Sequence, residues 1–146
     1  MDLRLFHVDA FTGKRFSGNP AAVCPLEEWP EDGLLHSIAA ENNLSETAFF
    51  AREGDGYRLR WMTPTTEVDL CGHATLATAF VLWNHLGCSD ETLRFETRSG
   101  PLTVRRRDDL IAMSFPLVPS APAQAPPALL EALGRATIET RYAGES

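Results

Sequence analysis

The chain has 146 residues, of which 44% are hydrophobic and 23% are charged, the proportions of a globular domain that buries its own core. Its 20 acidic and 13 basic side chains give a net charge of -7, which disfavours binding to nucleic acids and to anionic membrane surfaces. No apolar run is long enough to cross a bilayer, and the first residues lack a secretory signal pattern. We therefore expect a cytoplasmic protein with reduced cysteines and with neither nucleic-acid nor membrane partners.

The first half of the chain predicts four strands and one helix. Residues 3–10 carry apolar side chains on both faces, as an interior strand does, and residues 21–24 are expected to pair with them. Apolar side chains then recur at helical spacing over residues 30–42, which predicts an amphipathic helix. Residues 45–51 and the alternating residues 57–61 predict two further strands of a mainly antiparallel sheet.

The second half predicts a helix that other structure surrounds. Residues 72–86 are apolar on nearly all sides, so this helix must be buried at the centre of the domain. Residues 93–97, 102–106 and 110–115 predict short strands packed around it. The expected fold class is therefore α+β, with a mostly antiparallel sheet or barrel wrapped around a central helix.

The composition changes after Phe115. Five prolines lie between residues 116 and 127, a density that the interior of a sheet does not tolerate. We therefore interpret residues 1–117 as one domain. Residues 118–146 are interpreted as a proline-rich linker and the start of a missing or truncated second domain, with a short helix at residues 128–133.

Glu46 is the first candidate catalytic residue. It begins a predicted strand, and alternation places its carboxylate on the same face as Ala48 and Phe50. That face is apolar, and desolvation there favours the protonated carboxyl group, which suits a general acid or base. The alternative is a solvent-exposed carboxylate at a strand end, or a capping partner of Ser45.

A thiol, a glycine and an imidazole stand together at the start of the predicted central helix, as Cys71, Gly72 and His73. The first backbone N–H groups of a helix have no intrahelical partner, and the helix dipole favours an anion there, so a substrate carboxylate is a suitable ligand. His73 can donate a further hydrogen bond or a proton, and the same dipole is expected to stabilise a thiolate at Cys71. The alternative is that Cys71 is a small core residue.

A metal site has little support in the sequence. Cys71 and His73 are a possible chelating pair, but no second pair with zinc-like spacing occurs among the other cysteines and histidines, which are Cys24, Cys88, His7, His36 and His85. The sequence also lacks a nucleophile elbow, a phosphate-binding loop and a dinucleotide fingerprint. We therefore expect no metal and no cofactor, and proton transfer as the chemistry.

Five segments of the chain resemble the phenazine biosynthesis PhzF-like family, in the same order and at matching spacing. They are residues 8–12 (VDAFT), 16–23 (FSGNPAAV), 43–49 (NLSETAF), 60–64 (RWMTP) and 70–75 (LCGHAT). The resemblance implies the diaminopimelate epimerase-like fold, in which two similar halves each wrap strands around a central helix. The active site of that fold lies between the halves, and this chain matches the N-terminal half.

The resemblance also implies an isomerase that works without metal or cofactor. In this family the glutamate that corresponds to Glu46 shuttles a proton on a small carboxylic acid, and His73 assists it. The substrate is bound and oriented by the Gly-His pair and by a Gly-Asn-Pro turn that lines the cleft. The expected substrate-binding residues are Gly18, Asn19, Cys71, Gly72 and His73.

Two other functions stay open. A two-thiol epimerase or racemase would use Cys71 as one of its bases, because related enzymes carry a catalytic thiol at this position. A non-catalytic binding or assembly module would keep the fold for contact with a partner. The family's chains are much longer than this one, so we favour a truncated half of the enzyme over a pairing of two copies. The exposed cleft face would promote association, and a homo-oligomer such as a homodimer is expected.

Overall fold

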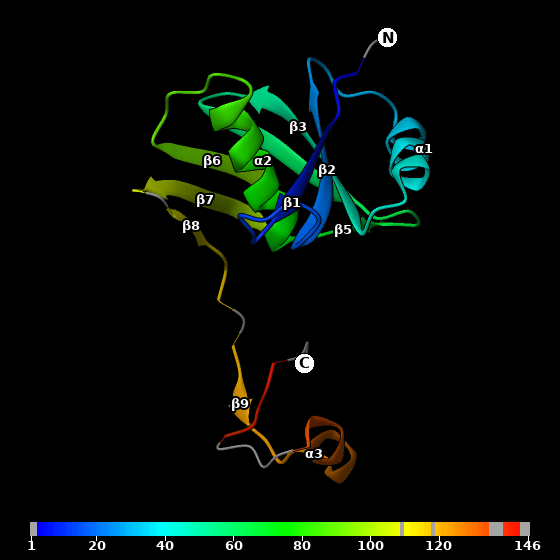
Figure 1. The fold of residues 1–146 in the computed structure, drawn as a ribbon, viewed down its shortest axis with the longest axis vertical. Coiled ribbons are helices and arrows are strands. Elements are labelled where there is room, and N and C mark those ends of the chain that lie inside the picture. Colours follow the sequence, from blue (N-terminus) through cyan, green and yellow to red (C-terminus); the bar gives the residue numbers. More distant parts are fainter. Residues whose placement is uncertain (1–2, 109, 118, 135–138, 144–146) are drawn as a thin grey trace. The chain divides into compact units, whose positions relative to one another are not determined.

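The computed structural model describes residues 3–108, 110–117, 119–134 and 139–143, which fall into two units. The first unit ends at Phe115 and the second begins at Pro116. The first unit contains a sheet of 8 strands in the order β1-β2-β3-β4-β6-β7-β8, with β5 paired to β4 (Figure 1). The strands are β1 (Phe6–Ala10), β2 (Asn19–Leu26), β3 (Glu46–Glu53), β4 (Gly56–Met62), β5 (Glu67–Val68), β6 (Thr92–Thr97), β7 (Gly100–Arg107) and β8 (Leu110–Ser114).

The sheet is mixed, although most of its strand pairs are antiparallel as expected. β2 and β3 run parallel because helix α1 (Asp32–Asn42) connects them and returns the chain to the same end of the sheet. β4 and β6 run parallel for the same reason, with helix α2 (Gly72–Asn84) in the connection. The pattern of apolar residues predicted the strands but not these two parallel pairings.

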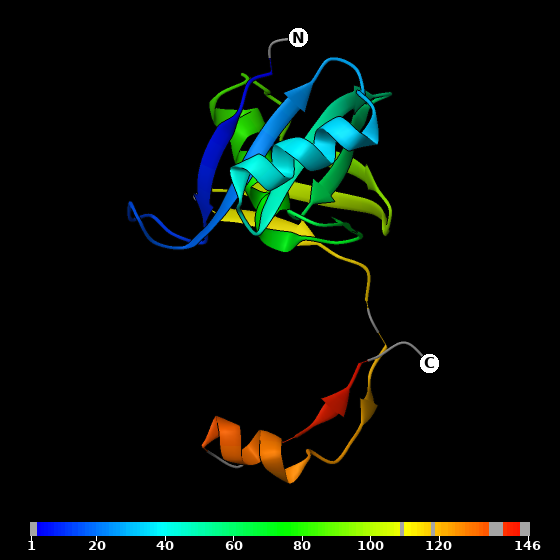
Figure 2. The same cartoon turned by 90° about the vertical axis from the view of Figure 1, so that its right-hand side faces the viewer.

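The two helices pack on opposite faces of the curved sheet. α2 lies inside the curve of the sheet, and α1 lies on its outer side (Figure 1). Figure 2 shows α1 lying across the outer face of the strands. Leu35 and Ala39 of α1 pack with Phe49 and Met62, whereas the inner face, with Trp61, packs in the core that contains α2. The face on which a strand residue lies therefore decides which helix it contacts.

α2 is buried on almost every side, as its sequence predicted. Of its large apolar side chains only Phe80 is exposed, at 40%. The hydroxyl groups of Thr75 and Thr78 are fully buried, and they donate to backbone carbonyls one turn earlier at 2.6 and 2.8 Å. The predicted α+β fold with a central helix is confirmed, although the helix ends at Asn84 rather than at residue 86. No helix within the described ranges, α2 included, is long and apolar enough to cross a membrane.

The first strand differs from the prediction. β1 begins at Phe6 and lies at the edge of the sheet, paired with β2 and with no second partner among the described residues. Phe6 and Val8 pack against the core, whereas His7 and Asp9 are exposed. The prediction of an interior strand was therefore wrong, because the two polar residues alternate with the apolar ones and face solvent.

The second unit is small. β9 (Ala121–Pro122) pairs antiparallel with β10 (Arg141–Tyr142), and α3 (Pro127–Leu133) lies between them in the sequence. The short predicted helix is present and begins at a proline, which is tolerated in a first turn because no intrahelical partner is lost there. It ends at Leu133 and is followed by Gly134, the C-cap residue, which has a positive φ of 65°. β9 lies within the residues interpreted as a linker and the start of a second domain, and its pairing with β10 was not predicted.

Candidate active site

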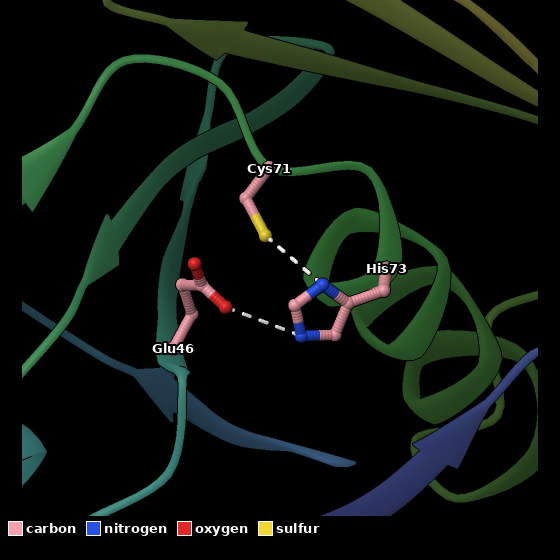
Figure 3. Close-up of side chains that lie close together, drawn as sticks. All are labelled: Glu46, Cys71 and His73. Atoms are coloured by element: carbon pink, nitrogen blue, oxygen red, sulfur yellow. Dashed lines mark hydrogen bonds and ion pairs between the residues drawn. The ribbon is translucent and has the colours of Figure 1, made fainter. Parts of the chain in front are cut away.

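Three of the predicted site residues converge where β3 and α2 begin (Figure 3). Glu46 is the first residue of β3, Cys71 directly precedes α2, and His73 lies in the first turn of α2. One side-chain ligand atom from each lies within 4.8 Å of the other two. Glu46 reaches this point because alternation along β3 places it on the inner face of the sheet, with Ala48 and Phe50.

The His73 ring lies between the carboxylate and the thiol. Its Nε2 atom is 3.3 Å from Oε2 of Glu46, and its Nδ1 atom is 3.4 Å from Sγ of Cys71 (Figure 3). The hydroxyl of Ser45 also lies 3.4 Å from Nε2. Nδ1 of His73 therefore lies beside the thiol, and Nε2 lies beside the carboxylate and the Ser45 hydroxyl.

The carboxylate of Glu46 is only partly satisfied. Its side chain is 19% exposed, but Oε2 is buried and has no hydrogen-bond partner of good geometry among the described residues. A buried carboxylate oxygen without a donor is costly, and native proteins seldom leave one. This oxygen is consequently the atom at the site that is available to a proton, a ligand or an ion.

Cys71 is buried, and burial is the largest effect on its thiol. The pKa of Cys71 is raised to about 11, mainly by desolvation, and the nearby Glu46 carboxylate acts in the same direction. The backbone N–H groups of Ala74 and His73 act in the opposite direction but do not compensate. The expectation that the helix start would stabilise a thiolate was therefore wrong, because desolvation outweighs the helix.

The protonated thiol suggests one consistent arrangement of hydrogens. A neutral Cys71 can donate its proton to Nδ1 of His73. A neutral imidazole that accepts at Nδ1 carries its own proton on Nε2, which lies 3.4 Å from the hydroxyl of Ser45 and 3.3 Å from Oε2 of Glu46. In this tautomer the Nε2–H group of His73 is shared between the surroundings of the Ser45 hydroxyl and the Glu46 carboxylate.

The start of α2 leaves backbone donors without a side-chain cap. Cys71 is the N-cap residue, and its side chain makes no capping hydrogen bond. Gly72 is the first helical residue, and a Cβ atom there would lie 3.6 Å from Cζ of Phe115, an ordinary contact. The fold alone therefore gives no steric reason for a glycine at this position.

Asn19 is the first residue of β2, and Gly18 directly precedes it. Gly18 has a φ of +85°, and a Cβ atom there would collide with the backbone oxygen of Ala10, so the hairpin itself requires glycine. Asn19 is exposed, and it lies at the same end and on the same face of the sheet as Glu46, because Ala21 pairs with Glu46 in the parallel register. The structure therefore gives Gly18 a conformational role and brings Asn19 to the same end of the sheet as the three converging side chains.

An ion-pair network next to the site was not predicted. Glu67 accepts two hydrogen bonds of 2.9 Å from Arg60, and Arg98 lies 3.3 Å from the same carboxylate. Arg60 also donates to Asp32 at 2.8 Å, and Arg98 contacts Asp69 at 3.0 Å. These contacts tie the segment that precedes Cys71 to α1 and to the β6–β7 turn. Strand alternation placed Arg60 on the face opposite Trp61, but no local pattern indicated its partners.

The family model of phenazine biosynthesis-like proteins matches residues 8–140 of this chain. A protein of Pseudomonas aeruginosa named as an uncharacterized isomerase is 59% identical over 140 residues, which cover 95% of this chain and 54% of that protein. The human phenazine biosynthesis-like domain-containing protein is 46% identical over 130 residues, covering 84% of this chain and 45% of the human one. The chain thus spans about half the length of the curated relatives that it matches.

Solved structures show the same relationship. A phenazine biosynthesis protein of the PhzF family from Enterococcus faecalis superposes with a TM-score of 0.86 at 47% identity, covering 95% of this chain and 54% of that one. A hydroxyproline epimerase from Agrobacterium vitis superposes with a TM-score of 0.54 at 12% identity, which shows a common fold alone. The fold and the sequence agree, and the chain belongs to the phenazine biosynthesis-like (PhzF) family.

Proposed function

We propose that this chain carries proton-transfer residues of a cofactor-independent isomerase that acts on a small carboxylic acid. The proposal rests on one observation above the others. A buried oxygen of Glu46 lacks a well-aligned donor and lies 3.3 Å from Nε2 of His73, at the start of a buried helix. The isomerase name of the bacterial relative supports the same class of reaction.

In this mechanism Glu46 is the general acid and base. Its carboxylate takes a proton from a carbon near the substrate carboxylate, so that a C–H bond breaks and an O–H bond forms. Glu46 then returns the proton to another carbon on the same face of the substrate. His73, whose Nε2 lies 3.3 Å from Oε2 of Glu46, orients the carboxylate between these two steps.

The substrate carboxylate is expected to lie at the start of α2. The uncapped backbone N–H groups of Gly72 and His73 supply donors, and the helix dipole stabilises the negative charge. A glycine at the first helical position lets the carboxylate approach the backbone closely. Asn19 is the further residue that we assign to binding, because it lies on the same face and at the same end of the sheet as Glu46.

A two-thiol epimerase is the second candidate. Cys71 contacts His73 and converges with Glu46, so the thiol lies at the same site, but a two-base epimerase needs its second base on the face of the substrate opposite the first. Burial opposes this role, because it raises the pKa of Cys71 to about 11 and leaves the thiol protonated at neutral pH. Replacement of Cys71 by alanine separates the two functions, since a Glu46 shuttle retains activity and a thiol base does not.

Solvent isotope exchange tests the role of Glu46. The wild-type chain is incubated in D2O with a panel of small amino acids, hydroxy acids and unsaturated acids, and deuterium uptake is followed by proton NMR. We expect E46Q to abolish uptake while it binds the same acid with a similar Kd, because the amide keeps the shape of the carboxyl group. The exposed Glu53 at the other end of β3 provides the control variant E53Q, which should keep full activity. Uptake retained by E46Q, or no uptake by the wild-type chain with any acid, contradicts the proposal.

A further inference from the structure

We propose that Glu46, Cys71 and His73 form a binding site for a soft divalent cation such as Zn²⁺, with an open fourth position. Binding of the ion does not depend on the isomerase activity, whereas its inhibitory consequence rests on the proposed function. Among the described residues, this is the group of three potential metal ligands whose side-chain atoms converge, all within 4.8 Å.

The donor atoms select the kind of ion. A thiolate, an imidazole and a carboxylate are the three ligand types that zinc prefers, and three protein ligands with a free position are typical of exchangeable or catalytic zinc sites. Mg²⁺ and Ca²⁺ require mainly oxygen ligands, and Glu46 is the one oxygen donor among these three side chains. The site therefore favours Zn²⁺ and Co²⁺ over the hard cations.

One ligand atom from each residue lies within 4.8 Å of the other two, so the donor atoms are close enough to contract around one ion. Zinc bonds of about 2.0–2.3 Å place neighbouring ligand atoms roughly 3.3–3.8 Å apart. Glu46 and His73 already approach to 3.3 Å, and Cys71 and His73 to 3.4 Å. These contacts use the two different ring nitrogens (Figure 3), and an ion binds only one of them, so the remaining ligand must move closer to that nitrogen when the ion binds.

The ligands come from rigid elements that the fold already holds together. Cys71 and His73 are two residues apart at the start of the buried helix α2, and Glu46 is supplied by β3 across from them. A second pair of cysteines or histidines is thus not needed, because the carboxylate is the third ligand. The buried Oε2 of Glu46, which has no well-aligned hydrogen-bond donor among the described residues, gains a partner when the ion binds.

Occupation by the ion has a functional consequence. Zn²⁺ replaces the thiol proton of Cys71, and it occupies the oxygen of Glu46 that would otherwise accept a proton. The ion and a transferring proton compete for the same atom, so a bound cation would block the proposed proton transfer. The site would then act as an inhibitory zinc site.

Binding of the ion alone provides the test. The untagged, reduced chain is titrated with Zn²⁺ in competition with a chromophoric chelator, and in parallel with Co²⁺ under anaerobic conditions. We expect one ion per chain and a thiolate-to-cobalt charge-transfer band. C71S should abolish the band, and both C71S and E46Q should weaken zinc binding about tenfold or more, because each removes a direct ligand.

A matched thiol separates this site from adventitious binding. Cys88 is half-buried, with its sulfur 3.7 Å from Oδ2 of Asp90, so C88S removes a different cysteine beside a carboxylate. C88S should bind zinc with unchanged affinity and keep the cobalt band. The absence of wild-type binding, a band that persists in C71S, or a band that disappears in C88S would overturn the proposal. Circular dichroism of each variant confirms the fold, and the isosteric E46Q supplies a second independent test if C71S unfolds.

Discussion

Replacement of Glu67 by glutamine should destabilise the first unit substantially. Glu67 is 14% exposed and accepts two hydrogen bonds from Arg60, which is itself 16% exposed, and it also pairs with Arg98. Removing one partner of a fully buried ion pair costs about 3–5 kcal/mol, whereas exposed pairs contribute under about 1 kcal/mol. Residual exposure and the remaining contact of Arg60 with Asp32 reduce the cost, so we expect a loss of about 2–3 kcal/mol in the free energy of unfolding.

The effect should depend on pH in a defined direction. Hydrogen bonds from Arg60 lower the pKa of Glu67, so its stabilising contribution is fully present above the ordinary glutamate pKa. That contribution is lost as the pH falls through the lowered value in the folded protein, and glutamine has no such titration. The stability difference between wild type and E67Q should therefore be largest at neutral pH and should shrink on acidification.

Urea unfolding at several pH values measures both the loss of stability in E67Q and its dependence on pH. E53Q, which changes an exposed glutamate of the neighbouring strand β3, is the control. E53Q should unfold with wild-type stability. Equal stability of E67Q and wild type at neutral pH would refute the assigned role of the ion pair. A difference that stays constant under acid would show that the loss comes from packing rather than from the charge.

The remaining predictions concern two glycines and one thiol. G18A should lower the free energy of unfolding by about 1–3 kcal/mol or more, because Gly18 has a positive φ and no room for a Cβ atom. G72A should leave the free energy of unfolding unchanged or raise it by up to about 1 kcal/mol, because a Cβ atom at Gly72 makes only an ordinary contact. Urea unfolding measures both. If G72A instead unfolds the chain, the glycine is structural and the argument for close carboxylate approach fails. Cys71 should react slowly with iodoacetamide at neutral pH and faster as the pH rises toward its pKa of about 11, followed by mass spectrometry in a metal-free buffer. Rapid alkylation at neutral pH would show that the thiolate is stabilised after all.

The parts of the fold that follow from local patterns were predictable. An apolar surface around the whole of α2 required a buried helix, and the structure places that helix inside the curved sheet. Alternation along β3 placed Glu46 with Ala48 and Phe50, and all three lie on the inner face. These predictions succeeded because the period of a strand or helix alone decides which side chains share a face.

Features that depend on distant parts of the chain were not predictable in the same way. The parallel pairing of β2 and β3 depends on how the chain returns through α1, which the strand sequences do not encode. The partners of Arg60 are reached only after folding, since Asp32 is 28 residues away in sequence. The pKa of Cys71 was predicted to be lowered, because its sequence neighbours indicate a helix start. It is raised instead, because the depth at which the thiol is buried depends on the whole sheet.

A comparison of two partly buried carboxylates shows why the chemistry is placed at Glu46. Glu46 and Glu67 are similarly buried, at 19% and 14% side-chain exposure. Glu67 faces two guanidinium groups that bind both of its oxygens, so it is held as an anion and is unsuited to proton exchange. Glu46 instead faces an imidazole, and its buried Oε2 lacks a well-aligned donor among the described residues. A proton and a soft cation are the two partners that this oxygen can take up reversibly, which is why the same atom carries both proposals.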